Sequence, residues 1–147
     1  MKKGDLKNII SSIGKEKNAY HYSYDEDVYL SEGHFILKTT DKLAQHIIDK
    51  VNEKKRRPEW SELRSLPNFF TVTGELCKKI ESGELSDGRS VLFLKQDDYV
   101  VTINKKFTID GGNFYTLGER KQVIEFVDIE GTLCILPIVN VERKKND

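Results

Sequence analysis

This chain of 147 residues has only two cysteines and three prolines, and its formal net charge is zero. Its two cysteines, Cys77 and Cys134, lie far apart and form no CxxC pair, which is typical of small core residues in a reducing compartment. The 24 basic residues balance 24 acidic ones, which argues against a nucleic-acid coat and against a polyacidic DNA mimic. No apolar run approaches the roughly 18 residues that span a bilayer, and no apolar signal core follows Met1. We therefore expect a protein of the host cell cytosol that makes no membrane contact.

The composition and length of the chain predict one folded domain. Hydrophobic residues make up 37% of the chain and aromatic residues 10%, which is enough for a core and argues against disorder. A chain of this length buries roughly two thirds of its unfolded surface, so it needs neither a disulfide nor a structural metal. We expect a single compact binding domain over residues 1–147, with a frayed tail at 142–147.

Apolar residues recur at helical spacing in two segments. Residues 6–13 follow the i, i+3, i+4, i+7 pattern and end at Gly14. After Asp41, which we expect to cap the helix, residues 43–51 form one apolar stripe that includes Ile47 and Ile48. A third, shorter helix is expected after a cap at Thr73, with Leu76, Cys77 and Ile80 facing inward and Gly83 just past its end.

The remaining patterns predict strands. Tyr20, Tyr22 and Tyr24 alternate with polar residues, and two further strands, residues 28–30 and 34–39, flank the turn Ser31-Glu32-Gly33. Branched and aromatic residues predict strands at residues 91–95, 99–104, 122–127 and 132–139, where Pro137 indicates an edge or a bulge. The expected fold class is α+β, a curved and mostly antiparallel sheet with two or three short helices packed on one face.

No catalytic or metal motif stands out. His21, His34 and His46 have none of the spacings of a zinc site, so a metal centre would require the fold to bring distant residues together. The acidic run Asp25-Glu26-Asp27 lacks the alternating ligands of a calcium loop. There is no GxSxG segment and no histidine near either cysteine in the sequence. We therefore expect no cofactor, no metal dependence and no enzymatic activity, with a small enzyme of dispersed active site as an alternative.

A basic cluster is the most distinctive local feature. Two interpretations fit it: cations near a helix C-terminus interact favourably with the helix dipole, or long basic side chains beside an aromatic contact phosphate or an acidic protein surface. Leu63 and Leu66, spaced from Trp60 like a helical turn, are expected to hold this loop-like stretch against the body. The members of the cluster are Lys54, Lys55, Arg56, Arg57, Trp60 and Arg64.

The tyrosines at positions 20, 22 and 24 offer a second candidate surface. A ladder of tyrosines on one side of a strand often forms a protein-binding face. The alternative is a half-buried sheet face whose hydroxyl groups reach the rim.

One segment resembles a known family. Residues 28–38 read Val-Tyr-Leu-Ser-Glu-Gly-His-Phe-Ile-Leu-Lys, and this segment is similar to a recurrent strand–turn–strand of the bacterial sliding clamp, the β subunit of DNA polymerase III. Ser31-Glu32 stands where the clamp turn has Thr-Asp. The order of helices and strands around it is similar to one clamp repeat and to small clamp-like phage proteins. The resemblance implies a clamp-like α+β architecture and a phage or other mobile-element origin.

Together these observations predict a non-enzymatic binding module that acts on DNA-handling or host-defence machinery, for example CRISPR, through protein–protein contact. A protein partner, including a nucleoprotein complex, is the leading expectation. A clamp-like accessory that contacts DNA directly is the alternative, and homo-oligomers are left open.

Overall fold

The computed structural model describes residues 3–64, 75–77, 79–95, 100–108, 113–117, 122–128 and 131–135. Predictions that concern Leu66, Thr73, Pro137 and the tail at 142–147 lie outside these residues. The first elements along the chain are α1 (Lys3–Gly14), β1 (Asn18–Tyr24), β2 (Asp27–Ser31), β3 (Phe35–Thr40), α2 (Asp41–Asn52) and β4 (Glu59–Glu62). The later ones are β5 (Glu75–Leu76), β6 (Lys79–Glu84), β7 (Ser90–Lys95), β8 (Val100–Asn104), the 3-10 helix η2 (Lys105–Phe107), β9 (Asn113–Leu117), β10 (Gln122–Asp128) and β11 (Gly131–Ile135).

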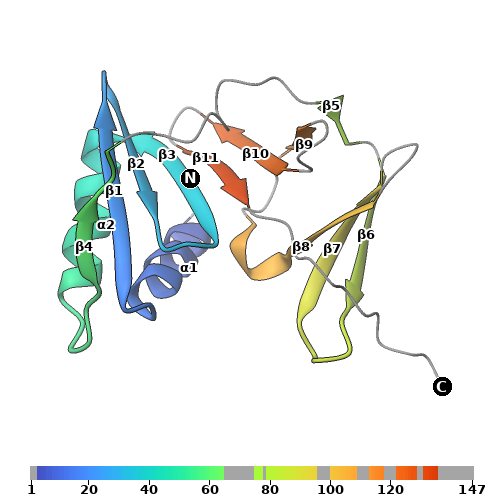
Figure 1. Cartoon of the computed structure of the whole chain (residues 1–147), viewed down its shortest axis with the longest axis horizontal. Helices are drawn as coiled ribbons and strands as arrows, with labels where there is room; N and C mark the ends of the chain where they lie inside the picture. Colours follow the sequence, from blue (N-terminus) through green and yellow to red (C-terminus); the bar gives the residue numbers. More distant parts are fainter. Residues whose placement is uncertain are drawn as a thin grey trace.

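The described strands form two sheets that are almost wholly antiparallel (Figure 1). The larger sheet has eight strands in the order β4-β1-β2-β3-β11-β10-β9-β5, and the smaller one has the order β6-β7-β8. Among the described pairs only β1 and β4 run parallel. The predicted α+β class is therefore confirmed, with two α-helices in the described part of the chain.

Helix α2 forms where its sequence pattern predicts. Ala44, Ile47 and Val51 are buried along one stripe, and Ile48 is half-buried at its edge. The cap differs from the prediction by one residue, because Thr40 is the N-cap and its hydroxyl oxygen accepts a hydrogen bond from the Leu43 N–H at 3.2 Å. A hydroxyl at this position satisfies one of the free N–H groups of the first turn, so Asp41 becomes the first helical residue.

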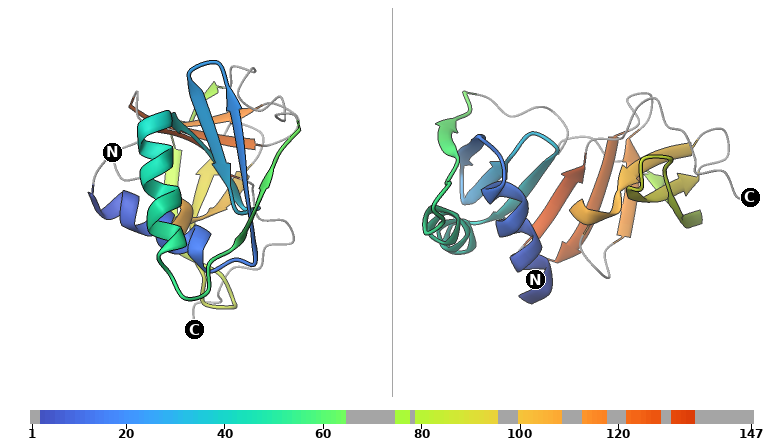
Figure 2. Two further views of the ribbon diagram at one scale, coloured as in Figure 1. Left: turned by 90° about the vertical axis from the view of Figure 1, so that its left-hand side faces the viewer. Right: turned by 90° about the horizontal axis from the view of Figure 1, so that it is seen from below.

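Both helices lie on the same face of β1–β3, and α1 contacts α2 as well as η2, which follows the smaller sheet (Figure 2). One continuous core fills the space between these layers. It combines Ile9 and Ile13 of α1 with Ile47 of α2, Leu30 of β2 and Leu94 of β7. The small sheet contributes Leu92 and Leu94 of β7 and Val101 and Ile103 of β8 to this shared core.

The predicted third helix is wrong for the residues that the structure describes. Instead, β6 pairs antiparallel with β7 along its whole length, from Lys79 opposite Lys95 to Glu84 opposite Ser90. Ile80, expected to face inward, is 47% exposed, whereas Cys77 is buried as expected. Gly83 is not a helix cap but a strand residue over the ring of Phe93, where an added Cβ would overlap the aromatic carbons. Pairing with the next strand of the chain has overridden a short helical period.

Candidate functional site

The strand β4 is the element that shapes the candidate site. It runs parallel to β1, with Ala19 opposite Trp60 and His21 opposite Glu62. The pairing is extended at both ends, since Glu59 N–H donates to Lys17 O and Leu63 N–H donates to His21 O, both at 2.8 Å. The sequence signal for this strand is weak, and Trp60 belongs to a strand rather than to the helical turn that its spacing indicated.

A groove of about 360 Å³ lies between α2 and the helix-facing side of β1 and β4. The helix contributes Ala44 of the buried stripe together with positions 41, 45, 48 and 52 beside it. Strand β1 contributes alternate side chains, since residues i and i+2 point to the same face. The lining residues are His21, Ser23, Val28, Asp41, Ala44, Gln45, Ile48, Asn52 and Trp60.

Trp60 forms one wall of the groove and is held in place by two contacts. Its Nε1–H donates to Asn52 Oδ1 at 2.9 Å, and its ring lies 6.5 Å from the ring of His21 with a tilt of 58°. The indole is half-buried against the core. The expectation that Trp60 is fixed to the body is confirmed, and Leu63 is half-buried as well.

The basic loop, which we define as Lys54, Lys55, Arg56 and Arg57, follows the end of α2. All four side chains are exposed, and none forms an ion pair with a described residue. The Lys54 stem crosses the end of α1, where a Cβ at Gly14 would lie 2.8 Å from Lys54 Cδ. Pro58, which is buried, ends the loop. The loop is thus anchored at both ends while its charges face solvent.

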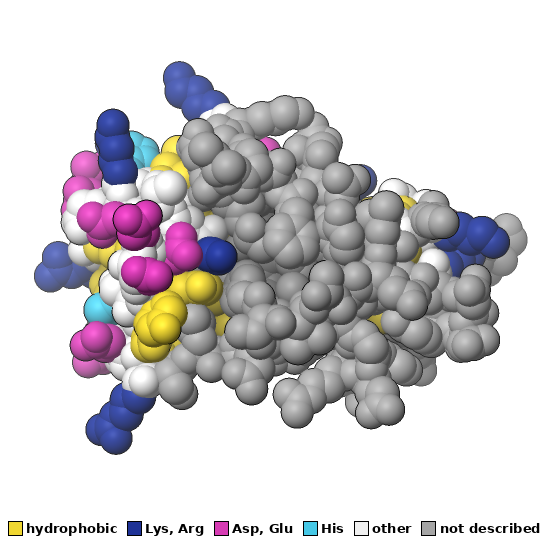
Figure 3. Space-filling view, turned by 90° about the horizontal axis from the view of Figure 1, so that it is seen from above, with side chains coloured by type: hydrophobic (Ala, Val, Ile, Leu, Met, Phe, Trp, Pro, Cys, Tyr) yellow, Lys and Arg dark blue, Asp and Glu magenta, His cyan; other side chains and the backbone are white. Residues whose placement is uncertain are grey.

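The two ends of the groove differ in charge. The basic loop lies next to Asn52, at the end of α2, and Asp41 lines the groove at the start of the same helix. Seen from above, the end of the molecule with the β1–β2 turn and the start of α2 shows a group of Asp and Glu side chains with hydrophobic, Lys and Arg side chains around it (Figure 3). Arg64 lies beyond β4, whereas the loop precedes β4. The structure therefore separates Arg64 from the other cations of the predicted cluster by the length of that strand.

The three tyrosines lie on the other face of the sheet. Tyr20 and Tyr22 are half-buried, and Tyr24 is 64% exposed. Tyr22 and Tyr24 stack with ring centroids 6.4 Å apart, and Tyr22 also contacts Tyr29 of β2. Burial, with the nearby Asp27 as the next cause, raises the pKa of Tyr29. The tyrosines thus lie on the face of β1 opposite to His21 and Ser23, and their role as a protein-binding face stays a prediction.

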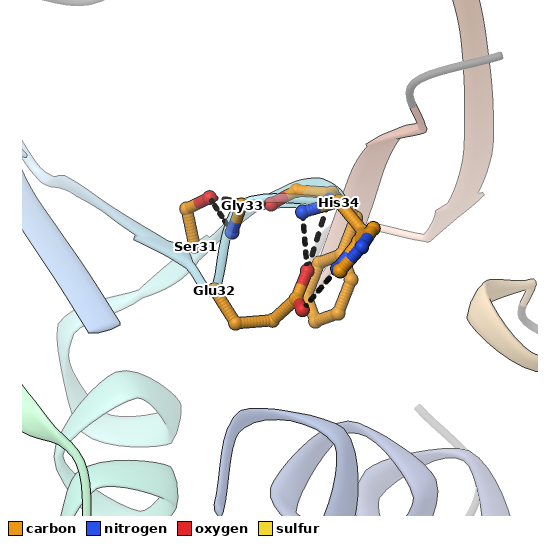
Figure 4. A network of polar contacts seen from close by, with 5 residues as sticks. Ser31, Glu32, Gly33 and His34 are labelled. Carbon is orange, nitrogen blue, oxygen red and sulfur yellow. Dashed lines mark hydrogen bonds and ion pairs between the residues drawn. The ribbon is translucent and has the colours of Figure 1, made fainter. Parts of the chain in front are cut away.

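Two turns in this sheet differ in structure: Asp25-Glu26-Asp27 leads from β1 to β2, and Ser31-Glu32-Gly33 leads from β2 to β3. The former begins with Asp25 at φ 59° and has exposed residues at 25 and 26. In the latter, Ser31 Oγ accepts the Gly33 N–H at 3.1 Å and donates to Phe35 O at 2.7 Å, while the Glu32 side chain is only 1% exposed (Figure 4). Gly33 has φ +112°, which a side chain would disfavour. This is the segment that resembles the clamp turn.

Cys77 has the surroundings of a structural cysteine. It is buried, and its Sγ–H lies 3.3 Å from Lys79 O and 3.6 Å from Lys95 O, at the start of β6 and the end of β7. This contact fits the expectation that it is a small core residue.

Comparisons with protein-family models, curated proteins and solved structures found no match to this chain. No helix among the described residues is both long enough and apolar enough to cross a bilayer. The clamp resemblance therefore remains a prediction, and the site must be interpreted from its own geometry.

The sequence pointed to Trp60 and the basic loop but not to the groove beside them. The available signal was the alternation in β1, where His21 and Ser23 occupy the face opposite the tyrosines. This alternation alone could not predict the groove, because the sequence does not show that α2 lies over the face that carries His21 and Ser23.

Proposed function

We propose that this protein is a non-enzymatic binding module that takes an extended, acidic segment of a protein partner. The segment would lie in the groove between α2 and β1–β4, with its acidic end at the basic loop. The single observation that supports this most strongly is the anchored Trp60, which lines the groove and lies three residues after the basic loop with its four exposed cations.

The dimensions of the groove suit a short peptide. Positions 41 and 52 lie eleven residues apart on α2, which corresponds to about 16 Å along the helix axis. An extended chain covers this length with about five residues. Gln45 and Asn52 provide amide groups along the way, and Ile48 and Trp60 provide apolar area. Polar groups spread along a channel in this way favour recognition of a chain over chemistry at one point.

Charge favours a protein segment over a nucleic-acid strand. A nucleic acid would present negative charge along its whole length, but the groove has Asp41 at one end and the basic loop at the other. Exposed Asp49, Glu53 and Glu59 also surround the loop. A partner whose charge changes along its length matches this arrangement better.

The narrower proposal concerns the partner's identity. The clamp-like segment at residues 28–38 supports a role on DNA-handling or host-defence machinery in a cell that carries a phage or other mobile element. The partner would then belong to such a machinery, or to one of its nucleoprotein complexes.

The test is a triple charge reversal of Lys55, Arg56 and Arg57 to glutamate. An affinity pull-down with mass spectrometry from the host cell identifies the partner, and calorimetry with the purified partner measures Kd. We expect the triple variant to bind at least tenfold more weakly, equivalent to about 1.4 kcal/mol. Its unfolding free energy should change little, since all three side chains are exposed.

A matched control carries the same change in net charge elsewhere. Lys3, Lys7 and Lys79 are exposed lysines outside the groove, and their combined reversal to glutamate should leave Kd unchanged. A loss of roughly 1 to 2 kcal/mol in stability with unchanged affinity would show that the loop only interacts with the helix dipole. Direct DNA binding that weakens steeply with salt would favour the clamp-like alternative instead.

A further inference from the structure

The fold brings three potential metal ligands together from two distant segments. Glu16 lies between α1 and β1, and Glu32 and His34 belong to the β2–β3 turn. One ligand atom from each residue lies within 4.8 Å of the other two. No sequence spacing indicated this group, because it contains one histidine and two glutamates rather than several histidines.

The carboxylate of Glu32 is fixed in its orientation by the turn itself. Its Oε1 accepts the N–H groups of His34 at 2.6 Å and of Phe35 at 3.1 Å (Figure 4). These bonds leave Oε2 directed at His34 Nδ1, which lies 2.7 Å away. The side chain is only 1% exposed, so this oxygen is preorganised and shielded on its inner side.

The imidazole of His34 is held but still open to solvent. Its ring stacks on Phe107 of η2, with centroids 5.3 Å apart and planes at 12°. The His34 side chain nevertheless keeps 59% exposure. A group bound at its nitrogen would therefore retain access to water.

The charge of the group is unbalanced without a cation. Glu16 is half-buried and its carboxylate has no hydrogen-bond or ion-pair partner among the described residues. It approaches the fixed carboxylate of Glu32, and two carboxylates at such a separation repel each other. Apart from the imidazole, no basic side chain forms an ion pair with either one in the described chain.

We infer that Glu16, Glu32 and His34 bind a divalent transition-metal ion of the Zn²⁺ class. A mixed set of carboxylate oxygen and imidazole nitrogen suits such ions, whereas Mg²⁺ and Ca²⁺ prefer oxygen alone. Ligand distances of about 2.0–2.2 Å separate two tetrahedral ligands by about 3.3 Å. The present 2.7 Å between Glu32 Oε2 and His34 Nδ1 therefore needs to widen by only about half an ångström.

Binding must displace a proton from the shared contact. The nitrogen that faces Glu32 Oε2 coordinates the ion through its lone pair, so a proton held there passes to the other ring nitrogen or to solvent. Water completes the coordination on the exposed side of His34. The ion would connect the α1–β1 segment to the β2–β3 turn, and affinity should fall in acid, where protons compete for the ligands.

Titration of the chelator-treated protein with ZnCl₂ alone, followed by calorimetry, tests this inference. We expect one ion per chain, with a rise in Tm of about 5 to 10 °C when free Zn²⁺ reaches about 100 times Kd. Glu16→Gln and His34→Ala should each weaken binding at least tenfold. His46→Ala, which removes an exposed histidine of α2, should not.

Co²⁺ in place of Zn²⁺ adds a spectroscopic readout, since its visible absorption should change in Glu16→Gln even if the fold is intact. Far-UV circular dichroism confirms that each variant is folded. The inference is overturned if the wild-type protein binds no Zn²⁺, or if Glu16→Gln and His34→Ala both bind it as tightly as the wild type. Neither result affects the groove, whose lining contains none of these three residues.

Discussion

Helix α2 and the three-stranded sheet differ in what determines their conformation: α2 buries its own apolar face, whereas β6 is held by its pairing with the next strand. In α2, the cap at Thr40 and the buried Ala44, Ile47 and Val51 all lie within one short segment. In the three-stranded sheet, β6 is defined by its pairing with β7, and its own apolar residue Ile80 is 47% exposed. A local pattern predicts structure where a segment buries its own apolar face, and it fails where pairing with a neighbouring strand decides the conformation.

Charge in the α2 stripe should produce the largest loss of stability. Ile47 is fully buried in the shared core, so Ile47→Asp places an unpaired charge there and should lower the unfolding free energy by about 3–5 kcal/mol. That is much of the stability of a typical domain. Urea denaturation followed by circular dichroism measures the effect.

Ile48→Asp is the matched control, one residue along the same helix. Ile48 is half-buried and lines the groove, so the new carboxylate keeps contact with water and the loss should be clearly smaller. Equal losses in the two variants would show that the helix presents a different face to the core. The comparison thereby separates the core stripe from the groove stripe of α2.

A strand could be predicted from the sequence where its own residues are apolar and buried, and not where only pairing with another strand extends it. Strand β7 was predictable because its residues 91–94 are apolar and all buried, with Leu92 and Leu94 in the main core and Val91 and Phe93 in a second cluster with Leu85. Strand β4 was not predictable, since Glu59-Trp60-Ser61-Glu62 has no strand pattern and is extended through its pairing with β1.

The candidate site also combines residues that are adjacent in the sequence with residues that are far apart in it. The basic loop and Trp60 are adjacent in sequence and remain adjacent in the fold, whereas the groove and the Glu16, Glu32 and His34 group depend on segments far apart. Residue type identified the individual side chains, but they come together only because the fold places α2 beside β1 and the α1–β1 connection beside the β2–β3 turn.

Gly83→Val tests the strand assignment of β6 at the point where the helix prediction failed. A side chain there would displace the buried ring of Phe93, and such overpacking costs about 1–3 kcal/mol. Ser82→Val introduces the same residue at an exposed position of the same strand and should change stability by less than about 0.5 kcal/mol. Denaturation curves that coincide for the two variants would contradict the packing of Phe93 against Gly83.

The smallest effect is expected at the turn between β6 and β7. Asp87 Oδ1 accepts the Arg89 backbone N–H at 3.1 Å, and Oδ2 accepts Arg89 Nε–H at 2.7 Å. The backbone hydrogen bond from Arg89 is the largest cause that holds the pKa of Asp87 below its usual value of 3.8, and the Arg89 side chain lowers this pKa further. Because the folded pKa lies below the unfolded one, the ionised carboxylate stabilises the fold above the unfolded pKa, and this contribution disappears as pH falls through the folded pKa.

Asp87→Asn should therefore lower Tm slightly at neutral pH, and its difference from the wild type should shrink as the pH falls below about 3.8. Thermal unfolding over a series of pH values measures this. Arg89→Ala removes the Nε–H donor but keeps the backbone N–H, so it should retain the part of the pH-dependent contribution that comes from the turn backbone. If Arg89→Ala instead reproduces the whole pH dependence of Asp87→Asn, the side-chain ion pair and not the turn backbone controls the carboxylate. The β6–β7 hairpin would then owe this contribution to a surface charge pair rather than to the backbone of its turn.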